Sequence, residues 1–391
     1  MKRIELQILL FSALIVTLPA HLEGSTVRIR LHAALKPETV VFAVRTGEYM
    51  MEIPGMEDVR IAPTKPVILF ASEGRVAVKW GTGRGVIADS VRFAPAGSAE
   101  TSHSFSVSVP GVAGERQYKG SMVCRNDNGI FLLLNETDIE SYLPGVVLAE
   151  GGPGRHREFY KAQAVLARTF AWQNLSKHAA DGYNICDDVH CQAYHGIIRD
   201  EDVTGAVKET SGIVMVTSDS VPALPAFHSN CGGETASASD AWVTSLPHLQ
   251  SVADPFCLSS RNATWRASLT TGAWINFLRK NDFTGDPASP GAISFNQDVR
   301  KPFFVPGNGI QIPVRSVRTE FGLRSSFFSL IASGDSVIID GRGYGHGVGM
   351  CQEGAMEMAR QGYSFERILS FYFRGISLID IADARQPPVI R

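Results

Sequence analysis

Short, alternating or β-branched runs fill the chain from Thr26 to about Met122, and Gly and Pro separate them. The runs include TVRIRLHA, TVVFAVRTG, PVILFAS, RVAVKW and FSVSVPG. Runs of this length between turn residues predict β-strands. The block contains no cluster of acids, histidines or cysteines, so we expect it to be a scaffold or a binding face rather than a chemical site.

Helical patterns begin only after this block. The segment EFYKAQAVLARTFAWQNLSKH is the strongest helix candidate, because Phe159, Ala162, Leu166 and Phe170 recur at helical spacing with no Gly or Pro between them. Just before it, NGIFLLLNETDIESYL predicts a strand and then a polar turn. We therefore expect an α+β fold, with a β-rich N-terminal part packed on a mixed α/β core.

The second half of the chain is less uniform. GIVMVT and SVIIDG predict strands, PALPAFHSNCGGETASASDAW is rich in loop-forming residues, and the region from Leu258 to about Arg315 is polar and irregular. After the glycine-rich GRGYGHGVGM, the pattern predicts a short helix closed by Gly362 and then a second, amphipathic helix.

Residues 1–24 have the layout of an export signal. Met1-Lys-Arg precedes the apolar run ILLFSALIVTLPA and the polar HLEGST. The run is short for a membrane span and no later segment is apolar enough to be one, so we expect an exported protein that is soluble in the periplasm or cell envelope. Cleavage after Ala20 fits only in part because Leu18 is large, and an uncleaved signal could act as a tether.

The charge of the chain bears on its partners. The formal net charge is −2, which gives no electrostatic footprint for nucleic acid or for an anionic membrane surface. We therefore expect a partner that is not a polyanion.

Glu150 ends the apolar segment YLPGVVLAE and is followed by two glycines. Either it is a solvated residue where a buried segment reaches the surface, or it is a carboxyl group at an apolar wall, where its proton affinity would rise. The GGPG loop would let a ligand approach closely, as a general acid requires. On the predicted helix downstream, Lys161 and Arg168 share one face, as substrate contacts or as a solvated basic stripe.

The segment CDDVHCQAYHG places Cys186, His190 and Cys191 within six residues. Two thiolates and an imidazole can supply three of the four ligands of a closed structural zinc site, with His178 or His195 as the fourth. A disulfide between the two cysteines, or two free thiols, is the alternative in an oxidising compartment.

The segment FHSNCGGET holds His228, Ser229 and Cys231. A Ser–His hydrolase is conceivable, but the strand-turn-helix surround of a nucleophile elbow is missing. A loop stapled by Cys231 and Cys257 fits the segment better.

The segment GYGHGVGMCQ holds His346 and Cys351 among glycines. A thiol–imidazole pair is one interpretation. The glycines suit a tight loop that lines a groove, in which the histidine would hydrogen-bond a ligand. The spacing is not that of a phosphate-binding loop.

Six segments resemble the SpoIID/LytB family of bacterial cell-wall proteins in sequence and in order: YLPGVVLAE, KAQAVLARTFA, CDDVHCQAYHG, FHSNCGGET, HLQSVADPFC and GRGYGHGVGMCQEGA. The resemblance runs from about Tyr118 to Phe373. It implies a SpoIID-like catalytic domain over residues 118–385, preceded by a β-rich region over 25–117. The implied activity is that of a peptidoglycan lytic transglycosylase on glycan strands stripped of stem peptides, and no cofactor is required for the chemistry.

The resemblance also implies roles for individual residues. The family's catalytic glutamate is carried over to Glu150 and the lysine of its KAQA motif to Lys161, which we expect to touch substrate rather than Glu150, because a nearby cation would oppose protonation of the acid. The zinc-binding stretch of some members corresponds to Cys186, His190 and Cys191. Of the two candidates for the fourth ligand, we expect His178. The remaining expected substrate contacts are Arg168, Ser229, Tyr344 and His346.

The sequence departs from the family pattern at two places. Gly151-Gly152-Pro153 follows the acid where MP is frequent, and Cys351-Gln352-Glu353 stands where the family often has SQW, which predicts a different loop and a different groove wall. Two alternative functions remain. One is a non-catalytic wall-binding protein that stimulates an amidase, and the other is a peptidase that uses Cys351 and His346 on stem peptides.

Overall fold

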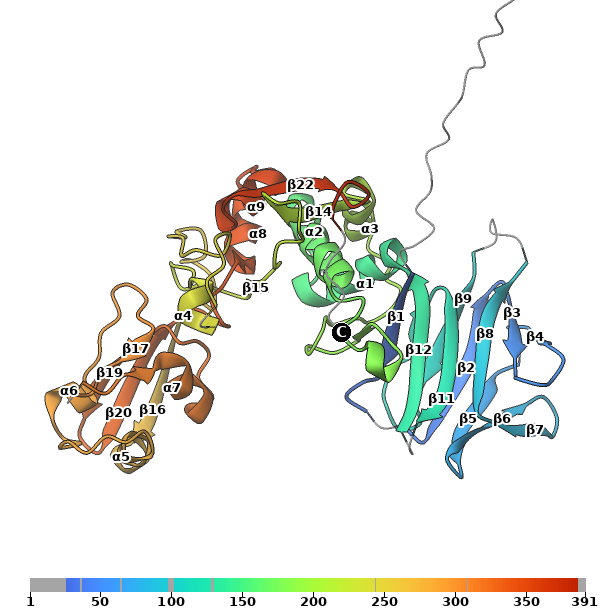
Figure 1. Ribbon diagram of the computed structural model, residues 1–391, viewed down its shortest axis with the longest axis horizontal. Helices are drawn as coiled ribbons and strands as arrows, with labels where there is room; N and C mark the ends of the chain where they lie inside the picture. Colours follow the sequence, from blue (N-terminus) through green and yellow to red (C-terminus); the bar gives the residue numbers. More distant parts are fainter. Residues whose placement is uncertain are drawn as a thin grey trace, which may run out of the picture.

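The computed structural model describes residues 26–35, 37–63, 65–97, 102–127, 130–242, 244–307 and 309–385. The expected export signal lies outside the described residues. Three parts follow one another along the longest axis of the molecule: a block of strands, a central group of helices and a smaller sheet at the opposite end (Figure 1). Helices and strands in several sheets confirm the predicted α+β class.

The block of strands consists of two sheets. The first has the order β13-β1-β12-β11-β8-β3-β4 and the second the order β10-β9-β2-β5-β6-β7. The strands are β1 (Thr26–Leu31), β2 (Thr39–Thr46), β3 (Glu48–Glu52), β4 (Val59–Ile61), β5 (Val67–Ser72), β6 (Arg75–Trp80), β7 (Arg84–Ala88), β8 (Ser90–Ala96), β9 (Ser104–Ser108), β10 (Arg116–Tyr118), β11 (Ser121–Asp127), β12 (Ile130–Asp138) and β13 (Ile185–Cys186).

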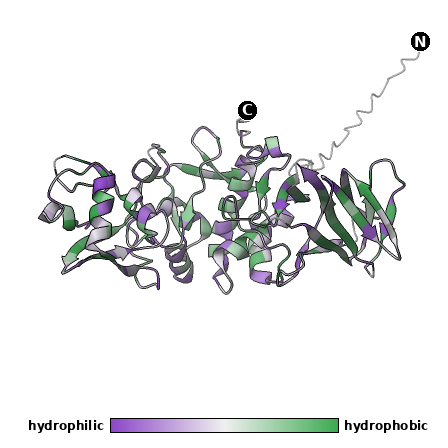
Figure 2. Ribbon diagram, turned by 90° about the horizontal axis from the view of Figure 1, so that it is seen from below, coloured by the Kyte–Doolittle hydropathy of each residue, from purple (hydrophilic) through white to green (hydrophobic). Residues whose placement is uncertain are grey.

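The two sheets pack face to face through apolar side chains. In β1, Val27 and Ile29 are buried while their neighbours Thr26 and Arg28 are exposed, as the alternation of the sequence predicts. Across the interface, the rings of Phe42 and Phe93 stack with their centroids 4.0 Å apart. Hydrophobic colour follows the strands of this block and the helices beside it (Figure 2).

The first sheet includes strands from both sides of residue 118. β12 pairs antiparallel with the whole of β1 and also with β11, while β13 adds the segment around Cys186 to the free edge of β1. The N-terminal strands therefore hold, through β12 and β13, the segments that lead into the central helices. The division of the chain at residue 117 stays a prediction.

The central part contains the helices of the candidate site. They are α1 (Ile139–Gly151), α2 (Arg157–Gln173), the 3-10 turn η1 (Ala179–Asp181), α3 (Glu201–Glu209), α4 (Ala238–Trp242), α8 (Gln352–Arg360) and α9 (Phe365–Tyr372). Two short sheets join distant segments: β14 (Ile213–Thr217) with β22 (Ile376–Asp380), and β15 (Phe227–His228) with β21 (Met350–Cys351). The predicted helix is α2, and its buried residues pack against α1, α3 and α9.

A third part, which we call the insert, lies between β15 and β21 in the chain. It comprises β16 (Thr264–Thr270), α5 (Thr271–Lys280), α6 (Pro290–Ile293), β17 (Phe303–Phe304), β18 (Ile312–Pro313), α7 (Val314–Phe321), β19 (Phe328–Ser333) and β20 (Ser336–Arg342). The expectation of an irregular region from Leu258 to Arg315 is therefore wrong. Trp274, Phe277 and Leu278 of α5 lie in a separate hydrophobic core.

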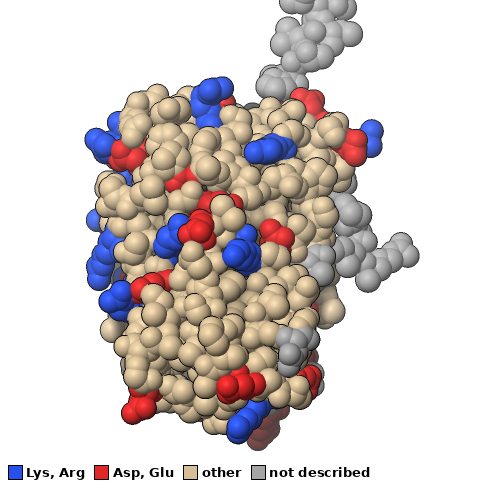
Figure 3. Space-filling view, turned by 90° about the vertical axis from the view of Figure 1, so that its left-hand side faces the viewer, with Lys and Arg blue, Asp and Glu red and all other residues tan. Residues whose placement is uncertain are grey.

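Two further features concern the surface charge and the length and polarity of the helices. At the insert end of the molecule, basic and acidic side chains are interspersed and neither sign dominates (Figure 3). Among the described residues, every helix is too short or too polar to cross a bilayer.

Candidate active site

Glu150 lies in the last turn of α1, at the point where the helix ends in glycines. The sequence predicted a polar turn before this segment, but β12 runs directly into α1, and Asp138 caps the helix by accepting a hydrogen bond from the Ser141 N–H at 2.8 Å. Gly152 then ends the helix with a φ of 72°, a conformation that favours glycine. The apolar residues of α1 are buried, and Glu150 itself is half-buried.

Two effects act on the carboxyl group of Glu150. Burial disfavours its charged form and raises its pKa, while a hydrogen bond from the Ala193 N–H to Oε1, 2.8 Å long, lowers the pKa by a smaller amount, so that the net shift is upward. Its place at the carboxyl end of a helix also disfavours a negative charge. Among the described residues, no Lys or Arg forms an ion pair with Glu150. Glu150, which the sequence singled out, therefore holds its proton to a higher pH than an ordinary glutamate does.

Glu150 lines an open groove of about 960 Å³. One wall is the end of α1 with the loop that contains Arg155 and His156, and the other is built from Ser229, the loop around Phe256–Asn262 and the first turns of α8. These walls come from four separated segments of the chain. Its volume and its open shape suit an extended polymer better than a small enclosed ligand.

Glu353 places a second carboxylate in the same groove. Its Oε2 accepts a hydrogen bond from Asn230 Nδ2 at 2.7 Å, and its Oε1 accepts from Ser229 at 3.4 Å and from Asn262. The sequence did not single out Glu353 as a site residue. The signal was present as the departure from SQW at positions 351–353, which predicted a different wall.

Gln352 connects the two walls of the groove. Its Nε2 donates to the backbone carbonyl oxygen of Glu150 at 3.1 Å and to Oε1 of Gln163, a buried residue of α2, at 3.3 Å. The start of α8 thus fixes the backbone of the acid directly. Sequence reasoning missed this contact because it joins residues about two hundred positions apart.

Lys161 does not line the groove. Its ammonium group lies 2.7 Å from Oε1 of Glu158 and 2.8 Å from Oε2 of Glu209, which links α2 to α3. The expectation that Lys161 avoids Glu150 agrees with this geometry, whereas its contact with substrate stays a prediction.

The structure corrects the expected role of Arg168 as a substrate contact. Its side chain is 1% exposed, so the alternative of a solvated stripe is wrong here, and it is too deeply buried to reach a ligand in the groove. Its guanidinium group donates to both carboxylate oxygens of Glu140, at 2.7 and 2.8 Å, and to the carbonyl oxygens of Ile213 and Val207. Arg168 therefore fastens α1, α2, α3 and β14 together.

The other three predicted sugar contacts lie in different places. Ser229 lines the groove of Glu150, whereas Tyr344 is exposed at 46% beside Arg324. His346 faces a separate cavity of about 260 Å³, next to Trp242. Burial lowers the pKa of His346 to about 4. The structure thus brings Ser229, but not Tyr344 or His346, to the wall opposite Glu150.

The predicted metal ligands His178, Cys186, His190 and Cys191 come together. Their ligand atoms all lie within 4.8 Å of one another. Cys191 Sγ is 3.5 Å from Nε2 of His178 and 3.7 Å from Nδ1 of His190, and the latter atom is 3.8 Å from Cys186 Sγ. A tetrahedral zinc site with two sulfur and two nitrogen ligands has ligand separations of about 3.5 to 3.8 Å. The donor set therefore fits zinc.

The surroundings of this cluster also fit a metal site. Nδ1 of His178 lies 3.5 Å from Oδ2 of Asp181, and Nε2 is directed at the cluster. Carboxylates commonly orient metal-binding histidines in this way. His178, not His195, is the fourth member. Both cysteines are free thiols rather than a disulfide. Two residues after Cys191, the same loop presents the Ala193 N–H to Glu150, so the cluster positions a hydrogen-bond donor of the acid.

The two other nucleophile hypotheses fail on geometry. His228 is buried with its Nδ1 on the carbonyl oxygen of Val348, and burial holds its pKa well below the usual value, so it is not poised as a base for Ser229. Nδ1 of His346 accepts from the Val348 N–H, while Cys351 is buried away from solvent. Cys231 and Cys257 are free thiols, 3.4 Å apart, rather than the expected disulfide.

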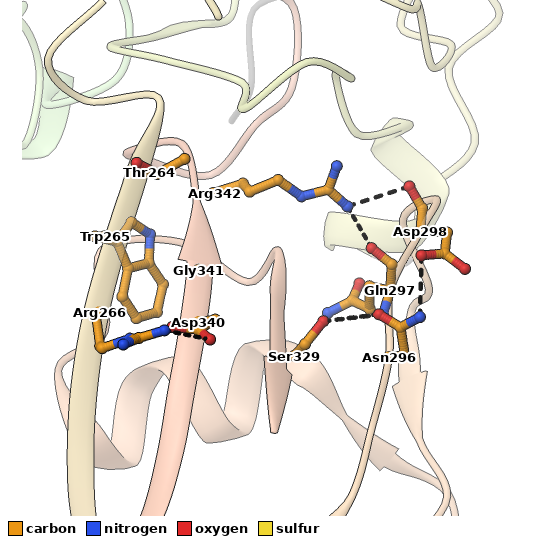
Figure 4. A pocket seen from close by; sticks show the side chains of 10 residues that line it. All are labelled: Thr264, Trp265, Arg266, Asn296, Gln297, Asp298, Ser329, Asp340, Gly341 and Arg342. Carbon is orange, nitrogen blue, oxygen red and sulfur yellow. Dashed lines mark hydrogen bonds and ion pairs between the residues drawn. The ribbon is translucent and has the colours of Figure 1, made fainter. Parts of the chain in front are cut away.

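A second concave surface, of about 610 Å³, lies on the insert (Figure 4). Its polar side chains bond one another: Arg266 pairs with Asp340, Asn296 with Asp298, and Arg342 reaches the backbone of Asp298. Its ionisable groups are thus engaged locally, in contrast to Glu150.

The chain is similar in sequence to known proteins. The model of the SpoIID family, described as stage II sporulation protein, matches residues 127–216, which span α1, α2 and the metal-ligand cluster. Stage II sporulation protein D of Bacillus subtilis is 30% identical over 263 residues, which cover 63% of this chain and 75% of that protein. An uncharacterized protein of Brachyspira hyodysenteriae is 32% identical over 68% of this chain and 73% of its own length.

A more distant relative is the amidase enhancer of Bacillus subtilis, which is 26% identical over 60% of this chain and 40% of its own length. The matches to stage II sporulation protein D extend well beyond the segment that the family model covers. The chain therefore belongs to the SpoIID family.

Proposed function

We propose that this protein is a peptidoglycan lytic transglycosylase that cleaves the bond between N-acetylmuramic acid and N-acetylglucosamine and leaves 1,6-anhydro ends. The observation that carries the proposal is Glu150: a half-buried carboxyl group with a raised pKa and no ion pair among the described residues, in the wall of an open groove. A cell-wall role is supported by family membership.

One acid is enough for this reaction, because the substrate supplies its own nucleophile. Protonated Glu150 gives its proton to the glycosidic oxygen as the bond from C1 to that oxygen breaks, and N-acetylglucosamine leaves with a new hydroxyl group. The C6 oxygen of N-acetylmuramic acid then bonds to C1, and the Glu150 carboxylate takes the C6 hydroxyl proton. The acid is regenerated and no water is consumed.

The other residues of the groove have binding and positioning roles in this proposal. The Ala193 N–H holds one oxygen of Glu150, and Gln352 holds its backbone. Ser229, Asn262 and Glu353 present hydroxyl, amide and carboxylate groups that suit the hydroxyl and acetamido groups of a sugar polymer. The cluster of His178, Cys186, His190 and Cys191 would hold a structural zinc ion that fixes the loop of Ala193.

A second candidate function rests on one observation, the similarity to an amidase enhancer. In that case the protein would bind glycan strands without cleaving them and would stimulate a cell-wall amidase. The groove would serve binding alone, and the raised pKa of Glu150 would have no chemical purpose.

The experiment that separates the two functions is product analysis by mass spectrometry. The purified protein is incubated with intact peptidoglycan, with peptidoglycan stripped of stem peptides, and with intact peptidoglycan plus a cell-wall amidase. The proposal predicts 1,6-anhydro ends from the stripped strands. Binding without anhydro ends, together with faster release of stem peptides by the amidase, would instead establish the enhancer function.

A further inference from the structure

A second cluster of metal-binding side chains lies beside the groove and has no part in the chemistry above. It consists of Cys231, Asp254, Cys257 and Cys351, all of which are 0% exposed. One ligand atom from each residue lies within 4.8 Å of the other three. The two expectations from the sequence, a disulfide between Cys231 and Cys257 and a thiol–imidazole pair at Cys351, do not explain why the four residues meet.

The separations match a tetrahedral site. Cys231 Sγ is 3.4 Å from Cys257 Sγ and 3.2 Å from Oδ2 of Asp254. Two sulfurs bound to one zinc ion lie about 3.8 Å apart, and a sulfur and an oxygen slightly less. A disulfide would use only two of the three thiols, and it would leave Cys351 and the buried carboxyl group of Asp254 without a function.

Hydrogen-bond donors surround the sulfurs as they surround metal thiolates. Cys351 Sγ accepts from the N–H of Cys231 at 3.2 Å and from the N–H of Gly354 at 3.4 Å. The N–H groups of Gly232 and Gly233 donate to Sγ of Cys257. Donors of this kind favour the thiolate form, which is the form that binds metal.

The carboxyl group of Asp254 is held in place in the same way. The Tyr372 hydroxyl group donates to its Oδ2 at 3.0 Å, and the Phe256 N–H donates to its Oδ1 at 2.9 Å. Hydrogen bonds to a ligating carboxylate fix its orientation. The guanidinium group of Arg300 donates to the Cys231 carbonyl oxygen at 2.7 Å, so a positive charge lies next to the cluster.

The four residues belong to the three segments that build one wall of the groove. Cys231 follows Ser229, Cys257 precedes the loop that reaches Asn262, and Cys351 is the N-cap of α8, the helix that begins with Gln352 and Glu353. An ion bound here would tie these segments to one another opposite Glu150.

We propose that Cys231, Asp254, Cys257 and Cys351 bind a structural zinc ion that fixes the wall of the groove opposite Glu150. Three sulfur ligands and one carboxylate leave no open coordination position, which fits a structural rather than a catalytic zinc ion. Thiol protons are released to solvent as the ion binds, so the affinity for zinc decreases as pH is lowered. This site is separate from the cluster of His178, Cys186, His190 and Cys191, and it does not depend on the proposed activity.

To test zinc binding at this site alone, the cluster of His178, Cys186, His190 and Cys191 is first removed by substitution. In the full-length chain with Cys186→Ser and Cys191→Ser, native mass spectrometry after reduction and refolding with zinc sulfate should show one zinc ion per chain. The ion should disappear when Cys351→Ser is added. The matched control is Cys124→Ser, a buried cysteine outside both clusters, which should leave the ion in place. A chain without zinc before the Cys351 substitution would overturn the proposal.

A second measurement needs no substitution, and so it tests the proposal even if the variants fail to fold. The unmodified chain, purified without added reductant, is unfolded in guanidinium with an alkylating agent, in the presence or absence of a chelator. The proposal predicts that Cys231, Cys257 and Cys351 all react fully once the chelator is present and without any reductant. A requirement for reductant at Cys231 and Cys257, with peptides lighter by two hydrogens, would establish a disulfide and contradict the zinc site.

Discussion

Two opposing effects set the pKa of Glu150. Burial raises the pKa of the carboxyl group, and the Ala193 N–H lowers it by less. A general acid must carry its proton when substrate binds, so the rate should be constant below the pKa of the folded protein and should fall as pH rises through it. We expect the alkaline limb of kcat/KM to lie above the ordinary glutamate value of 4.5. A limb at the ordinary value would contradict the role of burial.

The same shift has a consequence for stability that does not require activity. Because the pKa of Glu150 is higher in the folded than in the unfolded chain, its contribution to stability is present below the unfolded value and is lost as pH rises through the folded value. Glu150→Gln does not titrate. The melting temperature of this variant, relative to the parent, should therefore increase over the same pH range.

Arg168 and Lys161 lie on the same helix but should respond differently to substitution. Arg168→Leu leaves Glu140 without its ion-pair partner and removes the guanidinium donor from two carbonyl oxygens, which should lower the free energy of unfolding by about 3 kcal/mol. Lys161→Met removes ion pairs that are more exposed to solvent, and exposed ion pairs contribute little to the free energy of unfolding. Urea denaturation of the two variants measures the difference. Equal effects would contradict the structural role of Arg168.

At the scale of elements, the loop between β13 and α3 links the predicted zinc cluster to the acid. Cys191→Ser should remove one zinc ion per chain and loosen the loop that presents the Ala193 N–H to Glu150. We expect a loss of activity of roughly tenfold or more, because changes in residues that orient a site commonly have effects of this size. Metal analysis and rate measurement on the same preparation test this, with Cys124→Ser as the control.

The elements also show what the sequence could predict. α2 was predicted because no Gly or Pro interrupts its apolar spacing. α1 was missed because Pro144 and Gly145 interrupt the helical pattern. The Asp138 cap and the buried apolar residues of α1 nevertheless stabilise that helix. Glu150 and the four residues of the predicted zinc cluster were singled out because each is marked by a local motif. Glu353 was missed because its role depends on Asn230 and Asn262, which only the fold brings together.

At the scale of the whole molecule, the insert has a hydrophobic core of its own. The sequence missed it because its apolar residues are scattered among polar ones, and because β16 pairs with β20, which lies far along the chain. A separate core can open without the rest. Leu278→Ala should destabilise the insert by about 2 to 5 kcal/mol.

Hydrogen exchange measures whether that loss is confined to the insert. In Leu278→Ala, the amides of β16, β19 and β20 should exchange faster, while those of β12 and α2 keep their protection. The matched variant Leu166→Ala, in the large core, should have the opposite distribution. Faster exchange throughout the molecule in both variants would mean that the two cores unfold together.

The central claim is that Glu150 is the acid that cleaves glycan. The most direct measurement is the release of 1,6-anhydro ends from stripped glycan strands by the parent, by Glu150→Gln and by Glu357→Gln, a substitution of the same kind in the same groove. We expect Glu150→Gln to lose at least about a hundredfold in rate while it still binds glycan, and Glu357→Gln to keep most of the activity. Release of anhydro ends by Glu150→Gln at the parental rate would contradict the account.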